Sequence, residues 1–145
     1  MKVSEVMTRE VVLAEPGQTI AEAAQRMAKC DSGALPVGEN NRLVGMITDR
    51  DIALRAVARN LPPDTLVRKV MSTEVLYCFD DESLDHVAKN MGDQQIRRLP
   101  VVDRDKRLVG IISIADIAYS APSKTAGLAV ADISRPGGKH DQANQ

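Results

Sequence analysis

Two short stretches of the chain carry the same pair of polar residues at the same spacing. GMITDRDI contains Thr48 and Asp51, and GIISIADI contains Ser113 and Asp116. In both stretches the hydroxyl and the carboxylate are three residues apart, at the end of an apolar run. This spacing is typical of a capping box, in which the two side chains satisfy backbone N–H groups at the start of a helix.

The same residue types are also suited to holding a nucleotide. The first N–H groups of a helix are unpaired and attract phosphate, and a carboxylate beside them can accept hydrogen bonds from both ribose hydroxyls. A capping role alone explains the spacing, so both interpretations stand. Because the pair recurs at equivalent places, the sequence favours a shared function.

The repetition extends over most of the chain. A shift of 64 residues places Leu35-Pro36-Val37 on Leu99-Pro100-Val101, and after one inserted residue a shift of 65 places Asp51-Ile52-Ala53 on Asp116-Ile117-Ala118. Self-similarity of this kind predicts two copies of one structural unit with pseudo-two-fold symmetry. We expect a first repeat over 1–60 and a second over 61–121.

Each repeat is predicted to run strand, helix, strand, strand, helix. The predicted elements are short strands at 11–14 and 75–79, capped helices after Thr19 and Ser83, hairpins within ALPVGENNRLVGMIT and RLPVVDRDKRLVGIIS, and final helices at the quoted motifs. Two prolines in NLPPDT predict a linker between the repeats. The Gly, Ser, Lys, Gln and Asn content predicts a mobile tail over 122–145, although AGLAVADI could dock on the body.

Composition excludes several classes of protein. Nineteen basic and twenty acidic residues give a net charge of −1, and only 2% of residues are aromatic, which argues against nucleic-acid or membrane-surface binding. Apolar runs fall short of the about 20 residues that span a bilayer, and the N-terminus lacks a signal peptide, so we expect a cytoplasmic protein. Cys30 and Cys78 are expected to be reduced thiols. The sequence offers no catalytic constellation and no metal site.

In combination these motifs carry a family resemblance. VMT…VV, an amphipathic helix, ALPV or RRLPVV, and RLVGMITDRDI or RLVGIISIADI together resemble the cystathionine β-synthase (CBS) domain, present twice over about residues 2–120. The resemblance implies an α/β (α+β) fold of two β-α-β-β-α repeats packed through their sheets. A tandem pair resembles a Bateman module of the stand-alone bacterial type, which implies sensing and regulation, not catalysis.

The resemblance implies a ligand as well. Family members bind adenine nucleotides such as AMP, ADP, ATP or NAD, or S-adenosylmethionine, in two clefts between the repeats, and no metal is required. In the family the Thr/Ser-x-x-Asp pair contacts phosphate or ribose. These roles fall on Thr48 and Asp51 in one cleft and on Ser113 and Asp116 in the other.

Further site residues follow from the same resemblance. The residues that border the clefts are Gly33 and Ala34 in the first repeat and Arg97 and Arg98 in the second; Met7, Thr8 and Val12 are expected beside Ser113 and Asp116, and Met71, Ser72 and Leu76 beside Thr48 and Asp51. Arg50 could reach a phosphate, whereas Asp49 would oppose one. The arginine pair favours the Ser113/Asp116 cleft for a phosphorylated ligand, unless it is simply a solvated charge pair.

Association with other proteins is the remaining expectation. The resemblance implies a homodimer, a disc of four repeats, and an unidentified regulated partner. The alternative function is a ligand-free interaction or dimerisation module, in which both Thr/Ser-x-x-Asp motifs act only as helix caps.

Overall fold

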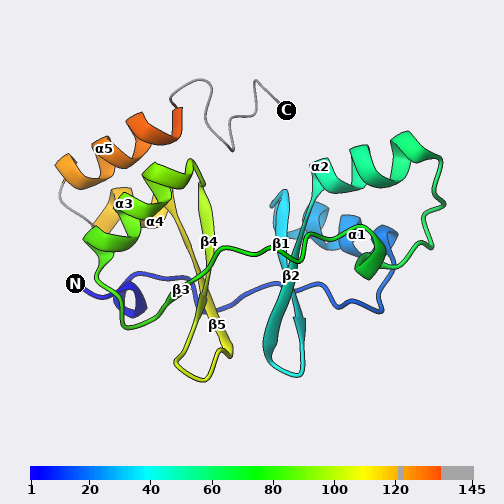
Figure 1. The fold of residues 1–145 in the computed structure, drawn as a ribbon, viewed down its shortest axis with the longest axis horizontal. Helices are drawn as coiled ribbons and strands as arrows, with labels where there is room; N and C mark the ends of the chain where they lie inside the picture. Colours follow the sequence, from blue (N-terminus) through cyan, green and yellow to red (C-terminus); the bar gives the residue numbers. More distant parts are fainter. Residues whose placement is uncertain (121–122, 135–145) are drawn as a thin grey trace. The chain divides into compact units, whose positions relative to one another are not determined.

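The computed structural model describes residues 1–120 and 123–134 (Figure 1). The elements in chain order are η1 (Val3–Glu5), α1 (Ile20–Cys30), β1 (Ala34–Glu39), β2 (Arg42–Thr48), α2 (Asp49–Asp51), η2 (Ile52–Ala56), η3 (Val57–Arg59), η4 (Val67–Lys69), β3 (Cys78–Phe79), α3 (Leu84–Gln94), β4 (Arg98–Val102), β5 (Leu108–Ser113), α4 (Ile114–Ser120) and α5 (Ser123–Ser134). This mixture of helices and small sheets confirms the predicted α+β class. Within the described ranges, no helix is long and apolar enough to cross a membrane.

The chain forms two compact units, which we name after the repeat that dominates each. The first-repeat unit comprises Val12–Val75 and Lys106–Leu108, and the second-repeat unit comprises Met1–Val11, Leu76–Asp105 and the described residues from Val109 onward. Each unit therefore contains the beginning of the other repeat. We call these stretches the leading segments: residues 1–11 lead the first repeat and lie in the second-repeat unit, and residues 61–75 lead the second repeat and lie in the first-repeat unit. This exchange of leading segments is a feature of the chain path that the sequence repeat does not reveal.

The first-repeat unit is built on an antiparallel hairpin. Strands β1 and β2 pair from Ala34 opposite Thr48 to Glu39 opposite Arg42, and Ala14 adds a parallel bridge to Val37. Helix α1 begins at a capping box in which the Thr19 hydroxyl accepts from the Glu22 N–H at 3.1 Å. Its apolar face packs on the hairpin in a cluster of buried side chains: Ala14, Ile20, Ala23, Met27, Leu35, Val37, Ile47, Ala56, Val67 and Val70.

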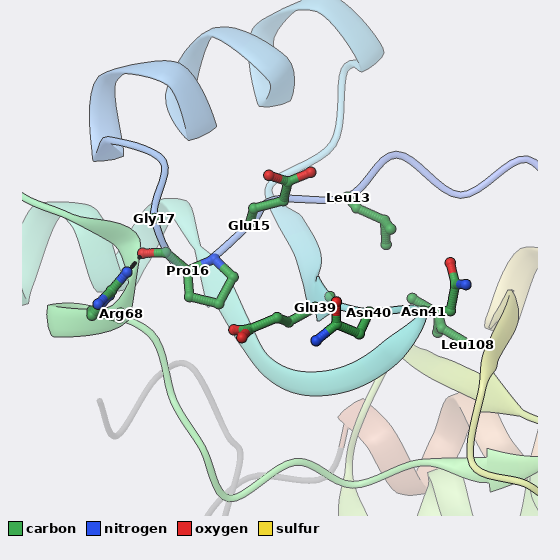
Figure 2. A pocket seen from close by; sticks show the side chains of 10 residues that line it. Leu13, Glu15, Pro16, Gly17, Glu39, Asn40, Asn41, Arg68 and Leu108 are labelled. Carbon is green, nitrogen blue, oxygen red and sulfur yellow. Dashed lines mark hydrogen bonds between the residues drawn. The ribbon is translucent and has the colours of Figure 1, made fainter.

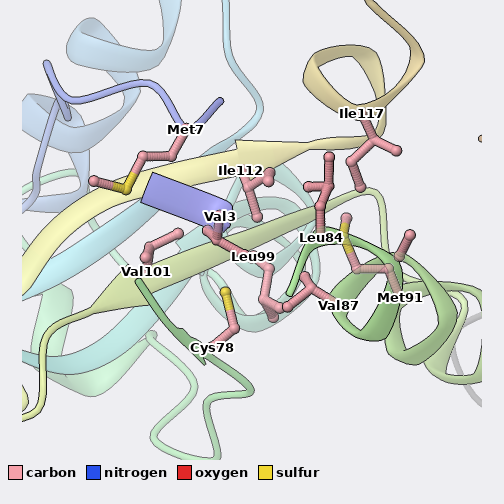
Figure 3. Packing of buried hydrophobic residues seen from close by; sticks show 11 residues of the cluster. Val3, Met7, Cys78, Leu84, Val87, Met91, Leu99, Val101, Ile112 and Ile117 are labelled. Atoms are coloured by element: carbon pink, nitrogen blue, oxygen red, sulfur yellow. The ribbon is translucent and has the colours of Figure 1, made fainter. Parts of the chain in front are cut away.

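The second-repeat unit has the same plan with a fuller sheet. The strand order is β3-β4-β5, and β3 is parallel to β4, with Cys78 opposite Val101. The Ser83 hydroxyl caps α3 by accepting from the His86 N–H at 3.1 Å. Side chains from the sheet, from α3 and α4 and from the leading segment pack together in one buried cluster (Figure 3). Its members are Val3, Met7, Cys78, Leu84, Val87, Ala88, Met91, Leu99, Val101, Ile112 and Ile117.

Each leading segment is bound to its host sheet by backbone hydrogen bonds. Thr8 and Ile111 exchange two N–H···O bonds of 2.9 Å. Ser72 and Met46 do the same at 2.8 and 2.9 Å. In each unit, the leading segment of the other repeat therefore pairs with the outer edge of the hairpin, along β5 in one case and along β2 in the other.

Three predicted elements differ in the structure. The strand expected at 11–14 is reduced to the single bridge at Ala14, and the one at 75–79 to β3, because the chain leaves one unit for the other at 11–12 and at 75–76. The tail predicted over 122–145 is corrected at 123–134, where alanine-rich sequence forms α5. Residues 122 and 135–145 lie outside the described residues.

The helix expected at DIALRAVARN is present but irregular. A three-residue α-turn, α2, continues as the π-helix η2 and the 3₁₀-turn η3. It ends at Asn60, whose left-handed φ of 59° suits asparagine. The helical path still carries the first Thr/Ser-x-x-Asp motif at its start.

Candidate nucleotide-binding motifs

The second-repeat motif forms a reciprocal capping box where β5 turns into α4. The Ser113 hydroxyl accepts from the Asp116 N–H at 3.1 Å, and the Asp116 Oδ2 accepts from the Ser113 N–H at 3.0 Å. The capping role is therefore confirmed. The second carboxylate oxygen of Asp116, Oδ1, has no hydrogen-bond or ion-pair partner among residues 1–120 and 123–134. One oxygen of this half-buried carboxylate remains able to accept from a ligand.

The first-repeat motif has the same geometry with one added charge. Thr48 Oγ1 accepts from the Asp51 N–H at 3.0 Å, and Asp51 Oδ2 accepts from the Thr48 N–H at 2.9 Å. Here Oδ1 lies 3.8 Å from the Nε of Arg55, one helical turn on. The guanidinium competes for the oxygen that is open in Asp116, so the two motifs are not equivalent.

The residues before each Leu-Pro-Val strand do lie against the motif of the same unit. The Gly33 carbonyl accepts from the Asp49 N–H, and the Arg97 carbonyl from the Ile114 N–H, both at 2.9 Å. Ala34 is paired with Thr48 in the hairpin register. These contacts place Gly33 and Ala34 beside the first motif and the start of the Arg97-Arg98 pair beside the second.

The two surroundings differ in size and charge. A Cβ atom on Gly33 would lie 2.7 Å from the Asp49 Oδ2, so a side chain at this position would require the Asp49 carboxylate to move. Asp49 itself accepts from the Arg50 N–H at 2.8 Å through Oδ1, and the Arg50 side chain is exposed. In the second repeat, Arg97 and Arg98 are both exposed beside the motif. The second motif therefore has the more positive environment.

The leading segments supply some of the remaining predicted site residues. Thr8 pairs with Ile111, two residues before Ser113, and Ser72 pairs with Met46, two residues before Thr48. Met7 and Met71 precede these positions and pack against Gly110 and Gly45.

The other two predicted residues fall in the opposite unit from their motif. Val12 belongs to the first-repeat unit and Leu76 to the second. Their side chains are 42% and 44% exposed. Their placement beside Ser113/Asp116 and Thr48/Asp51 stays a prediction.

A separate depression of 480 Å³ lies at the turn end of the β1–β2 hairpin (Figure 2). It is lined by Leu13, Glu15, Pro16, Gly17, Gly38, Glu39, Asn40, Asn41, Arg68 and Leu108. None of the predicted site residues is among them, and Thr48 and Ala34 are at the other end of the same hairpin. This depression is therefore not the predicted nucleotide site.

The equivalent positions in the second repeat carry three side chains that contact one another. Phe79, Asp81 and Arg104 stand where Glu15, Gly17 and Asn40 stand in the first repeat. The Arg104 guanidinium lies 4.2 Å from the Phe79 ring centroid and donates to both Asp81 oxygens at 2.8 and 2.6 Å. These hydrogen bonds lower the pKa of Asp81 from its usual value. Glu15, Gly17 and Asn40 supply neither an aromatic ring nor a guanidinium, so the first repeat lacks this stack.

The CBS family model matches the chain twice, over residues 3–57 and 67–122. The chain belongs to the CBS domain family, as a tandem pair. It is 44% identical over 133 residues to the CBS domain-containing protein YhcV of Bacillus subtilis, covering 91% of this chain and 94% of that protein. Hypoxic response protein 1 of Mycobacterium tuberculosis is 38% identical over 120 residues, covering 81% and 83%. These relatives indicate no catalytic family.

Solved CBS structures include ligand complexes. The CBS domain pair of MJ0100, in complex with 5-methylthioadenosine and S-adenosyl-L-methionine, has a TM-score of 0.72 at 33% identity and covers 86% of this chain and 98% of that one. PAE2072 from Pyrobaculum aerophilum, complexed with AMP, has a TM-score of 0.73 at 29% identity, covering 90% and 99%. CBS pairs with this fold thus bind adenine compounds.

One similar structure contains metal. Hypoxic Response Protein I, with two coordinated zinc ions, has a TM-score of 0.75 at 35% identity and covers 84% of this chain and 100% of that one. In the part of the present chain that the structure describes, no group of three or more His, Cys, Asp or Glu residues could hold a metal ion.

Proposed function

We propose that this CBS pair is a regulatory module that binds an adenine nucleotide (AMP, ADP, ATP or NAD) at its Thr/Ser-x-x-Asp motifs. The observation that carries the proposal is the second-repeat motif, where Asp116 keeps one carboxylate oxygen open beside the Arg97-Arg98 pair. The complexes of similar CBS pairs with AMP and S-adenosyl-L-methionine support the class of ligand.

In this proposal different residues contact the ribose and the phosphate of the ligand. Asp116 Oδ1 accepts from the ribose hydroxyls, because a carboxylate is the acceptor that a vicinal diol requires. Arg97 and Arg98 attract the phosphate, since guanidinium groups match phosphate oxygens in charge and geometry. Met7 and Thr8, on the adjoining leading segment, border the same site.

The first-repeat motif is proposed as the weaker site. Arg55 occupies the vicinity of Asp51 Oδ1 at 3.8 Å, and the exposed Asp49 carboxylate opposes a phosphate. Arg50 supplies one exposed positive charge, and Gly33 and Ala34 leave room for a base. We expect a phosphorylated ligand to occupy the second-repeat motif at lower concentration.

A second candidate function is ligand-free association. The reciprocal capping bonds favour it, because they account for both motifs without a ligand. The first-repeat unit also exposes Leu54, Val57 and Leu61 along one helical segment and its end, a surface suited to a homodimer.

Since adenine nucleotides are cytoplasmic metabolites, the nucleotide-binding proposal places the protein and its regulated partner in the cytoplasm.

Thermal unfolding with AMP, ADP, ATP, NAD and S-adenosylmethionine tests the proposal. The key variant is Asp116→Ala, and its matched control is Glu22→Ala, which removes the carboxylate of the capping box at Thr19, away from the motifs. Both variants lose the carboxylate half of a capping box and keep the hydroxyl half, and the lost hydrogen bond costs about 1 kcal/mol. A ligand at about 100 times its Kd adds about 2.7 kcal/mol to the stability of the protein that binds it.

The two candidate functions give opposite results. If the nucleotide proposal holds, at least one compound stabilises the wild type and Glu22→Ala equally, and Asp116→Ala loses most of that stabilisation. If the motifs are only caps, no compound shifts the wild type, and both variants simply melt earlier by similar amounts.

A further inference from the structure

Gln95 is the one buried side chain that is polar or charged among the described residues, and it is 5% exposed. It ends α3 in the left-handed conformation, with φ of 56°. That conformation is unfavourable for residues other than glycine and asparagine, and burying an amide is costly unless its hydrogen bonds are made. The buried amide of Gln95 therefore requires hydrogen-bond partners.

Helix α5 provides one such partner. The Gln95 Nε2 donates to the Asp132 carbonyl at 2.9 Å. In Figure 1, α5 lies along α3 and close to α4, and it contacts both helices. The amide thus joins the end of α3 to a helix that follows the second repeat in sequence.

The first repeat shows that this arrangement is not required by the corner itself. The equivalent residue, Asp31, ends α1 with nearly the same left-handed φ of 53°, yet its side chain is exposed. Within the described residues, Asp31 has no side-chain hydrogen bond. The turn therefore does not require a buried amide, and in the second repeat this amide makes a contact with α5.

The segment that Gln95 anchors leads directly to the second-repeat motif. Arg97, two residues on, accepts from the Ile114 N–H at the start of α4. Helix α4 carries Asp116 and also contacts α5. The carboxylate thus lies on a helix that contacts α5, and the arginine pair follows Gln95 by two and three residues.

We propose that α5, held by Gln95, is a positioning element of the second-repeat nucleotide site and sets its affinity. This inference rests on the proposed function. The docked helix fixes the 95–98 segment against α4, so a ligand that contacts both selects the state in which α5 is docked. By linkage, docking raises ligand affinity by the same factor by which the ligand favours docking.

Gln95→Met tests this in the full chain. Methionine is close to glutamine in length, is likewise unbranched at Cβ, and meets the same left-handed backbone cost, but it lacks the amide donor. Gln94→Met, at the exposed neighbouring position on α3, is the matched control. AMP affinity is measured by calorimetry, and backbone amide hydrogen exchange over 127–134 reports α5 docking, with and without AMP.

Three results support the inference together. AMP slows exchange in α5 of the wild type, Gln95→Met speeds it, and Gln95→Met weakens AMP binding about fivefold or more, while Gln94→Met changes neither quantity. If Gln95→Met frees α5 but AMP binds with wild-type affinity, the positioning role is overturned and the proposed function survives. If no adenine compound binds the wild type, both are overturned.

Discussion

Replacing Gly110 by alanine tests how the leading segment is seated on the second-repeat sheet. A Cβ at Gly110 would lie 2.9 Å from the Thr8 carbonyl oxygen and 2.6 Å from the Met7 sulfur, whereas ordinary contacts begin at 3.4 Å. The methionine end can swing away, but the carbonyl belongs to a backbone that is fixed by two 2.9 Å hydrogen bonds to Ile111. That segment would have to retreat by about 0.5 Å, the difference between 3.4 and 2.9 Å.

The cost follows from what the retreat disturbs. Overpacking of this kind destabilises by about 1–3 kcal/mol, and each weakened backbone hydrogen bond contributes about 1 kcal/mol. We expect the free energy of unfolding of Gly110→Ala to fall by about 2 kcal/mol and Tm to fall by about 5–10 °C. Gly45→Ala should behave alike, because its Cβ would lie 2.8 Å from the Ser72 carbonyl oxygen.

Gly127→Ala is the matched control for the same chemical change. A Cβ there meets nothing within 4 Å, and alanine favours a helix interior over glycine by about 1 kcal/mol. Urea unfolding at equilibrium measures all three variants. If Gly110→Ala and Gly45→Ala unfold at the same urea concentration as Gly127→Ala, the leading segments are not seated on the sheets as described.

Three further predictions concern single groups. Burial, aided by Glu82 and Asp80, raises the pKa of Cys78 from 9.0 to about 12. Above pH 9 the unfolded chain loses this proton while the folded chain keeps it, so the free energy of unfolding falls as pH rises from 9 to 12. Urea unfolding of Cys78→Ala should show a shallower decline over that range. The hydrogen bonds from Arg104 lower the pKa of Asp81, so an NMR titration of Arg104→Met should return that pKa toward 3.8, and an unchanged value would refute the pairing. Thr48→Ala should destabilise the chain by about 1 kcal/mol in urea, as Thr19→Ala should, since both remove a hydroxyl cap; a cost near zero at Thr48 would mean that its cap is not formed in solution.

The local parts of the fold were predictable because neighbouring residues decide them. Thr19, Ser83 and both Thr/Ser-x-x-Asp pairs cap helices as their spacing predicts. The hairpins follow from alternating apolar strands and polar turns, and the Asn40-Asn41 turn uses the positive φ angles of 55° and 64° that asparagine tolerates.

The long-range parts were not predictable from these local patterns, and only the family resemblance led us to expect Met7 and Thr8 beside the second motif, and Met71 and Ser72 beside the first. Nothing local to Thr8 or Ser72 specifies a strand edge that lies more than a hundred residues later or 26 residues earlier. The available signal was the glycine that opens both quoted stretches, since Gly45 and Gly110 have no room for a side chain against the leading segments. Helix α5 was not predicted because the composition was judged over the whole of 122–145. The Gly, Lys, Gln and Asn residues at the end of that range outweighed the alanines of Ser123–Ser134.

The most direct measurement of the central claim is a backbone amide NMR titration of the full chain with AMP. We predict that the largest shift changes fall on Arg97–Leu99 and Ser113–Asp116, with smaller changes on the first-repeat motif only at higher AMP concentration. Changes confined to Glu39–Asn41 at the turn-end depression, or no changes at all, would contradict the assignment of the Thr/Ser-x-x-Asp motifs as the nucleotide site.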